Sequence, residues 1–99
     1  MKVNINSVHF KTDSKLEEFI REKIEKLSSV FDNILSSEVT LKLDNNEKKK
    51  NKISEIKLNI PGNELFVSKQ SKSFEESFDN AVEALRKQLK KHKEKMRKK

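Results

Sequence analysis

The side chains best suited to chemistry in this sequence are lysines and arginines near its C-terminus. They recur at intervals of three or four positions in two adjoining rows, with Arg86, Lys90, Lys93 and Arg97 in one and Lys87, Lys91 and Lys98 in the other. On a helix, residues spaced in this way share a face. A broad cationic face can contact the phosphates of a nucleic acid, and we expect it to bind them mainly through charge.

The positive charge of the chain is concentrated in this segment. The formal net charge is +7 over 99 residues. Residues 86–99 hold nine basic residues and one acid, a net of +8, whereas residues 1–85 hold 14 basic and 15 acidic residues, a net of −1. This distribution predicts a polyanionic partner, which could be a nucleic acid, an anionic membrane surface or an acidic protein. The alternative is a solvated helix end that lysines keep in solution.

Three lysines in the first third of the chain could extend this surface. Lys15 and Lys26 are eleven positions apart, so they share a helical face, and Lys23 lies nearby. The competing interpretation is that these lysines form salt bridges within their own helix, each worth about 0.2–0.5 kcal/mol. The available acids are Glu18, Glu22 and Glu25.

The sequence offers no set of residues suited to catalysis. Its two histidines, His9 and His92, fall on different predicted elements, and there is no cysteine to act as a nucleophile or metal ligand. The single glycine, Gly62, excludes a phosphate-binding P-loop and a dinucleotide-binding fingerprint. We therefore expect a protein that is not an enzyme and uses no cofactor or metal. His92, among lysines, is expected to contact phosphate or donate a hydrogen bond.

Two apolar stripes predict the helices that position these residues. The first comprises Leu16, Phe19, Ile20, Ile24, Leu27 and Phe31, and the second comprises Phe74, Phe78, Ala81, Val82, Leu85, Leu89 and Met96. Both have the three-and-four spacing of an amphipathic helix. Thr12, Asp13 and Ser14 offer N-cap residues before the first helix. Ser14 with Glu17, and Ser73 with Glu76, have the spacing of a capping box at the start of each helix.

Alternating apolar residues predict four strands. These are residues 3–5, 39–43 and 56–60, and a returning strand 65–70 after the turn at Pro61 and Gly62. The order β-α-β-β-β-α predicts an α+β fold with a four-stranded mixed sheet, its first two strands parallel and the rest antiparallel. Because only one face of each strand is apolar, both helices should cover the same face.

Two features lie outside this pattern. Phe66 should point to the open face of the sheet, where it could stack on a base or pack on neighbouring strands. Residues 44–52 contain no apolar side chain but include Lys48, Lys49, Lys50 and Lys52, and they predict a mobile loop. The sequence assigns neither feature a role.

Length and composition predict one cytoplasmic domain covering residues 1–99. No apolar stretch approaches the roughly 20 residues that span a bilayer, and the first residues lack the apolar run of a signal peptide. The absence of cysteine is compatible with a reducing compartment. Residues 86–99 are expected to form a basic helical extension whose turns from about Lys90 onward project beyond the core and fray.

Several separated motifs resemble the ribosome hibernation-promoting factor family, which includes the ribosome-associated inhibitors. The run from Leu89 to Lys95, the stretch from Glu22 to Leu27 followed by Phe31-Asp32, and the opening Val3-Asn4-Ile5 carry the resemblance. Residues 55–68 with their Gly62 turn, and Phe78-Asp79, also fall where the family has them. The resemblance therefore covers the whole chain and matches the family's short form, without the C-terminal dimerisation domain of long members.

The resemblance implies the β-α-β-β-β-α fold, related in shape to double-stranded-RNA-binding domains, and a set of contact residues. By position the implied RNA contacts are Lys23, Lys26, Lys87, Lys91, His92, Lys93 and Lys95, to which the helical spacing adds Arg86 and Lys90. Asp79 matches an acidic position that we expect to orient the second helix. Ala84 stands where many members have a basic residue, so that contact is absent or has moved to Arg86 or Lys87.

The function implied by the resemblance is inhibition of translation. Family members bind the small ribosomal subunit in the channel for mRNA and for the A-site and P-site tRNAs, and hold the ribosome inactive in starved or stationary cells. This implies competition with tRNA and mRNA for rRNA phosphates, a free protein that is a monomer, and inactive single ribosomes. The alternative is a basic adaptor that binds RNA or acidic proteins without a defined ribosomal site.

Overall fold

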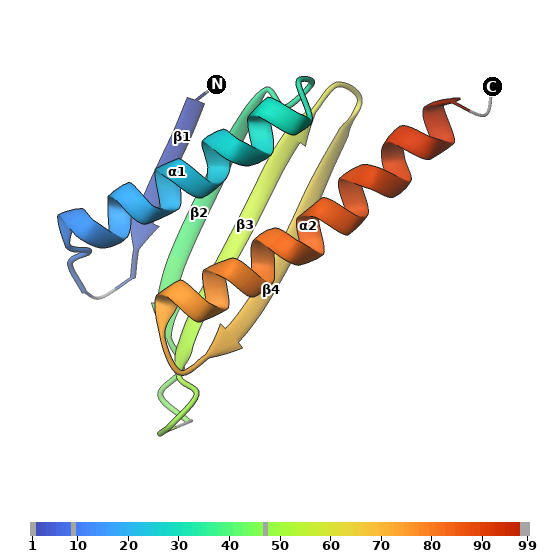
Figure 1. Ribbon diagram of the computed structural model, residues 1–99. Coiled ribbons are helices and arrows are strands. Elements are labelled where there is room, and N and C mark those ends of the chain that lie inside the picture. The colour runs from blue at the N-terminus through green and yellow to red at the C-terminus, as the bar shows by residue number, and fades with distance from the viewer. Residues whose placement is uncertain (1, 9, 47, 98–99) are drawn as a thin grey trace.

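A computed structural model describes residues 2–8, 10–46 and 48–97, with side chains in the last helix described as far as His92. Its elements follow the predicted order (Figure 1): β1 (Lys2–Ser7), α1 (Ser14–Val30), β2 (Ser36–Leu43), β3 (Lys52–Ile60), β4 (Asn63–Ser71) and α2 (Phe74–Arg97). The strands lie in the order β1-β2-β3-β4. β1 pairs with β2 in parallel, and the other neighbours are antiparallel. The predicted topology is confirmed.

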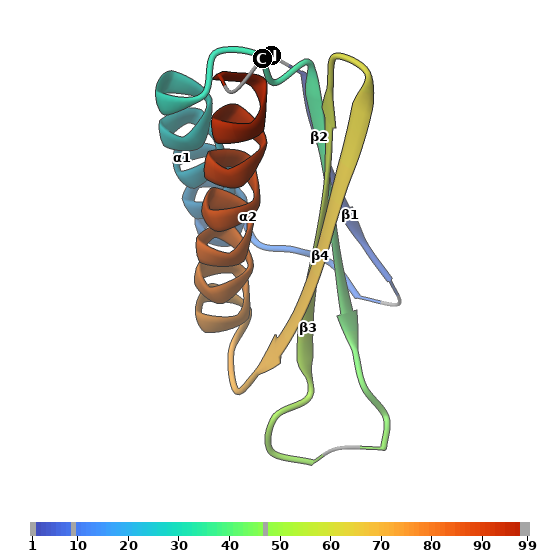
Figure 2. The same cartoon turned by 90° about the vertical axis from the view of Figure 1, so that its right-hand side faces the viewer.

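Both helices cover the same face of the sheet, as Figure 2 shows in profile. The core lies between these two layers, where Phe78 and Leu85 of α2 and Ile20 of α1 are fully buried. Burying a side chain of this size stabilises the fold by about 1.5–3 kcal/mol. The apolar stripes of the helices and the inward residues of the strands therefore fix how α1 and α2 lie on the sheet.

Both helices are capped by residues that the sequence offered, but the cap of α1 is not the serine of the predicted capping box. Ser14 is the first residue of α1, and Asp13 caps the helix by accepting a hydrogen bond from the Leu16 amide at 2.7 Å. The Ser14–Glu17 assignment was therefore wrong by one position, because Asp13 is an equally good cap residue. At α2 the Glu76 amide donates to Ser73 Oγ at 3.1 Å, as expected.

The strands extend further than the apolar alternation indicated. Ser37 and Ser54 occupy inward positions of β2 and β3 and are fully buried, and Ser54 Oγ lies 2.7 Å from Ser77 Oγ of α2. Lys52 is the first residue of β3, so the prediction that it belongs to the loop was wrong. At the other end of β3, Gly62 has φ of 76°, which the turn requires and which glycine adopts without strain.

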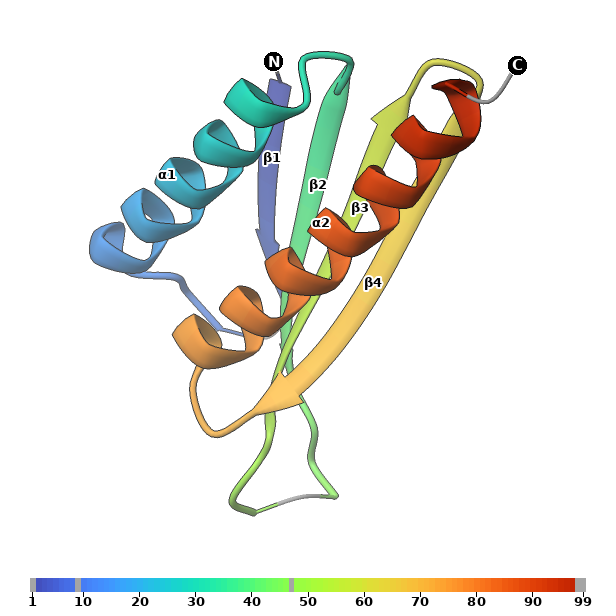
Figure 3. The same cartoon turned by 45° about the vertical axis from the view of Figure 1, so that its right-hand side comes forward.

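The second helix is the longest element and runs almost the full length of the molecule. Its 24 residues correspond to about 36 Å at about 1.5 Å per residue, and the molecule measures 47 × 24 × 18 Å. Figure 3 shows α2 starting at the end of the sheet that carries the β2–β3 connection and running toward the end that carries the β3–β4 turn. The fraying expected from Lys90 onward stays a prediction.

Candidate nucleic-acid interface

The outward face of α2 carries the cations that the sequence singled out. Arg86, Lys87, Lys90 and Lys91 are all exposed. On the opposite side of the helix, Leu85 is fully buried and Leu89 nearly so. The helix thus separates an apolar face that anchors it from a cationic face that solvent reaches. The side chains of Lys93 and Lys95 lie outside the described residues, so their place in this surface stays a prediction.

The cations of α2 divide between the two flanks of the helix. Arg86 lines a groove on the side of α1. Lys87 lines a hollow with Lys69 of β4, and Lys91 lines another with Asn63 and Leu65. The predicted single face is therefore a wide band that reaches from the α1 side of the helix to the β4 side.

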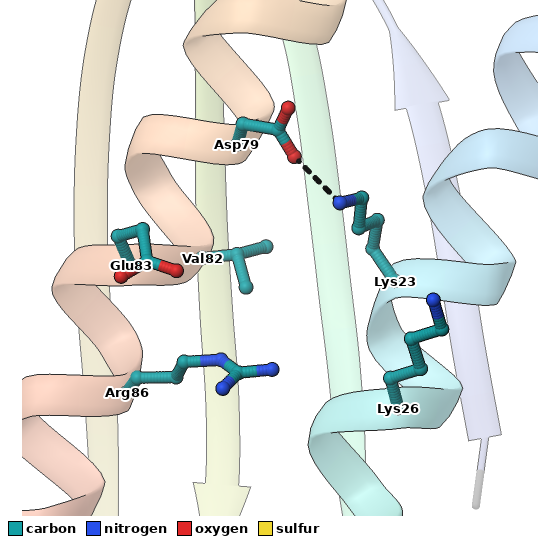
Figure 4. Close-up of a pocket in the computed structure, with 6 residues that line it drawn as sticks. All are labelled: Lys23, Lys26, Asp79, Val82, Glu83 and Arg86. Atoms are coloured by element: carbon teal, nitrogen blue, oxygen red, sulfur yellow. Dashed lines mark ion pairs between the residues drawn. The ribbon is translucent and has the colours of Figure 1, made fainter.

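A groove of 430 Å³ separates α1 from α2 and gathers charged side chains from both helices. Its lining residues, drawn in Figure 4, are Lys23, Lys26, Asp79, Val82, Glu83 and Arg86. Three cations and two acids therefore share the groove. The structure brings Lys23 and Lys26, the two predicted α1 contacts, into the same groove as Arg86 (Figure 4).

One ion pair crosses this groove. Lys23 Nζ lies 3.2 Å from Asp79 Oδ1, and the two side chains are 37% and 47% exposed. The same ammonium group lies 5.5 Å from the centre of the Phe19 ring. Among the described residues this is the one ion pair that α1 forms, so Lys23 pairs across the helices and not with the acids of its own helix. Asp79 thereby gains a specific partner, while its expected role in orienting α2 is still a prediction.

His92 and Ala84 lie at the edges of the cationic band. His92 is half-buried and lines the hollow that also contains Lys91 and Gln88, beside the β3–β4 hairpin. Ala84 is half-buried and packs against the core. It also lines the hollow that contains Lys87. Lys87 is therefore next to the place where Ala84 supplies no charge.

The open face of the sheet has a different electrostatic character. Lys57 lies 3.8 Å from Glu38 and 3.6 Å from Glu64, and Lys42 pairs with Glu55 at 2.9 Å. These cations are compensated by carboxylates, so this face is less suited to phosphate than the outer face of α2. Phe66 is 55% exposed there and lies opposite Lys57 in the register. Its outward direction is as predicted, and its role is untested.

Sequence reasoning missed Lys69 and Glu83 as members of the site. Lys69 has the same strand parity as Leu65 and Val67, which point toward the helices, yet it is exposed. It lines a hollow with Lys87 at the edge of α2. A lysine at an inward strand position was the available signal, because such a side chain must emerge beside the covering helix. Glu83 gave no signal, since an exposed acid on a helix is common.

Residues 3–97 match the family model described as sigma 54 modulation protein / S30EA ribosomal protein. This chain belongs to that family. The match spans both helices and all four strands, so the family assignment covers the cationic surface as well as the core. The resemblance drawn from the motifs is thereby confirmed.

Two relatives named ribosome hibernation promoting factor illustrate the family. The one from Pseudomonas putida is 35% identical over 95 residues, which cover 96% of this chain and 89% of that protein. The one from Escherichia coli K12 is 30% identical over 97 residues, which cover 98% of each. The similarity therefore runs along nearly the whole of both relatives.

Two solved structures share the fold. A ribosomal subunit interface protein from Coxiella burnetii superposes with a TM-score of 0.84 at 20% identity, covering 94% of this chain and 98% of that one. The N-terminal domain of Protein Y from Thermus thermophilus superposes with a TM-score of 0.79 at 20% identity, covering 93% and 99%. At this identity the likeness establishes the α+β architecture. None of the described helices is long and apolar enough to cross a membrane.

Proposed function

We propose that this protein binds the small ribosomal subunit and holds the ribosome inactive during starvation or stationary phase. The observation that carries the proposal is the cationic band on α2, mounted on a helix whose other face is fully anchored in the core. The relatives are named ribosome hibernation promoting factor. This name supports the ribosome as the partner and an inactive ribosome as the result of binding. Such a partner would place the protein in the cytoplasm.

The chemistry of the band supports binding by charge and shape. Exposed lysines on a rigid helix can neutralise several phosphates without reading base sequence. Structured RNA is recognised largely through its backbone and shape. The contacts we propose are the seven residues implied by the family together with Arg86 and Lys90, acting with no catalytic step.

The same chemistry supports competition with tRNA and mRNA. We place the protein in the channel for mRNA and for the A-site and P-site tRNAs, whose rRNA walls present the phosphates that it needs. A protein lying there would exclude those ligands sterically and by occupying the same cation-binding surface. Inhibition would then require only that the protein occupies the channel. Residues 1–99 would act as one ribosome-binding domain.

Sedimentation with separated ribosomal subunits tests this proposal. We expect the protein to pellet with the small subunit and not with the large one. We also expect that it cannot bind when tRNA and mRNA are bound to the subunit first. Equal pelleting with both subunits, or binding that tRNA leaves unchanged, would contradict the proposed site. That result would favour a basic adaptor without a defined ribosomal site, which the charge distribution alone also permits.

A further inference from the structure

A second cluster of lysines lies at the opposite end of the sheet from the basic half of α2. The loop between β2 and β3 carries Lys48, Lys49 and Lys50, all exposed. Figure 1 shows this loop projecting beyond one end of the strands. At the other end, Lys91 and His92 of α2 line a hollow with Asn63, the first residue of β4. We call Lys48–Lys50 the lysine loop.

Hydrogen bonds at its base fasten the lysine loop to the sheet. Gln70 of β4 donates from Nε2 to Asp44 Oδ2 at 2.9 Å and to the Lys50 carbonyl at 2.5 Å. The Asp44 amide donates to the Asn51 carbonyl at 2.9 Å. Gln70 of β4 thus bonds to both sides of the base of the loop.

The carboxylate of Asp44 is already engaged within this base. Its Oδ1 accepts a hydrogen bond from the Asn46 amide at 2.9 Å. That bond, and then the one from Gln70, hold the pKa of Asp44 below its usual value against a small opposing effect of desolvation. The carboxylate therefore stays ionised as a structural acceptor whose two oxygens face the loop backbone and Gln70.

Strand length sets the distance between the lysine loop and the end of the cationic band that carries Lys91 and His92. β3 has nine residues between the loop and the β3–β4 turn, which at about 3.4 Å per residue separates its ends by roughly 27 Å. This is more than twice the Debye length of about 8 Å at physiological ionic strength. Phosphates along one strand of a duplex advance by about 3.4 Å each, so the loop and the Lys91–His92 end of α2 cannot contact the same few phosphates.

We propose that the lysine loop is a second RNA-contact site, which binds phosphates of an rRNA segment separate from the one bound by α2. This inference rests on the proposed function. The ion-paired open face of the sheet lies on the side away from α2 (Figure 2) and contributes little to either region. Once α2 is bound, the loop engages its segment in an intramolecular step at high effective concentration.

Two triple variants with the same change in charge test the proposal. The first changes Lys48, Lys49 and Lys50 to Gln, and the control changes Lys2, Lys11 and Arg21 to Gln, which are exposed cations outside both sites. Each lost phosphate contact lowers the salt slope of binding by about one. We expect the loop variant to bind the small subunit at least tenfold more weakly with a slope lower by 1 to 3 units, and the control to bind within about threefold of the parent.

Directed cleavage of rRNA provides an independent test. Because the chain has no cysteine, an Asn45→Cys or a Gln88→Cys variant carries one thiol for an iron–EDTA probe. We expect the two probes to cut separate rRNA segments. Overlapping cuts, or a loop variant that binds like the parent with an unchanged slope, would overturn the second site. If the parent itself does not bind the small subunit, the proposed function fails instead. Thermal melts of both triple variants test whether a loss of binding is due to misfolding.

Discussion

The Lys23–Asp79 pair shows how one residue can serve two partners. Lys23 is a predicted RNA contact, yet it lies 3.2 Å from a carboxylate of the neighbouring helix. A half-exposed pair of this kind stabilises a fold by about 0.2–1 kcal/mol at most. Phe78 and Leu85, both fully buried, already anchor α2 in the core. The pair thus contributes little to the free energy of unfolding, but its carboxylate offsets positive charge in the groove.

We therefore predict that Asp79→Asn strengthens RNA binding. The substitution removes a negative charge that competes with phosphate for Lys23, while the free energy of unfolding should fall by less than about 1 kcal/mol. Small-subunit affinity at constant salt and urea unfolding measure the two effects, and Asp32→Asn on an exposed site is the matched control. Weaker binding with unchanged stability would show instead that Asp79 orients Lys23 toward the RNA.

Residue-scale prediction from the sequence succeeded where a side chain's own type decided the outcome. The cationic positions of α2 that the structure describes are exposed as expected, because charged groups on an amphipathic helix avoid the core. The partner of Lys23 could not be found in this way, since acids on its own helix were equally plausible. Only the packing of α1 beside α2 makes Asp79 the partner that is within reach.

At the scale of the element, the buried face of α2 stabilises the fold and its exposed face carries the proposed binding residues. Changing Lys87, Lys90 and Lys91 to Glu should lower the net charge by six units. All three positions are exposed, and surface substitutions usually change the free energy of unfolding by no more than about 0.5 kcal/mol each. We expect binding to the small subunit to be lost while the melting temperature changes little. A triple variant that binds as well as the parent would exclude α2 as the RNA-contacting element.

Leu85→Ala is the converse experiment on the same helix. Leu85 is fully buried, so its truncation should lower the free energy of unfolding by about 2–5 kcal/mol. The exposed cations are untouched, and the fraction that stays folded should bind with the parent's affinity. Denaturant unfolding and binding at low temperature measure both quantities. A stability loss below about 1 kcal/mol would mean that the core stripe of α2 is wrongly assigned.

Element boundaries were harder to predict than element types. The apolar alternation located all four strands, but β2 and β3 begin earlier because inward positions are filled by serine. Ser54 can be buried since its hydroxyl pairs with Ser77 of α2 at 2.7 Å, a contact between residues 23 positions apart. Periodicity reports which face is apolar, and it has no means of anticipating a polar pair that forms only when the helix docks.

At the scale of the whole molecule, uneven charge makes binding sensitive to ionic strength. A protein that neutralises roughly 6 to 10 phosphates loses about 10³ to 10⁵ in affinity between 50 and 200 mM salt on duplex DNA. We expect the same direction with a shallower slope on a ribosome, where magnesium already screens the phosphates. Titrations at several potassium concentrations and fixed magnesium measure the slope, and an affinity that does not vary with salt would contradict a phosphate-led mechanism.

β1 has a consequence for the motions of the native protein. It is a six-residue edge strand that pairs with β2 alone, and none of its described side chains is fully buried. Such a segment can open while the rest of the molecule stays folded. We expect the β1 amides to exchange with deuterium faster than those of β3, which has partners on both sides. Equal protection would show that both strands open only on global unfolding. Because β1 carries none of the proposed contact residues, its opening would leave bound RNA in place.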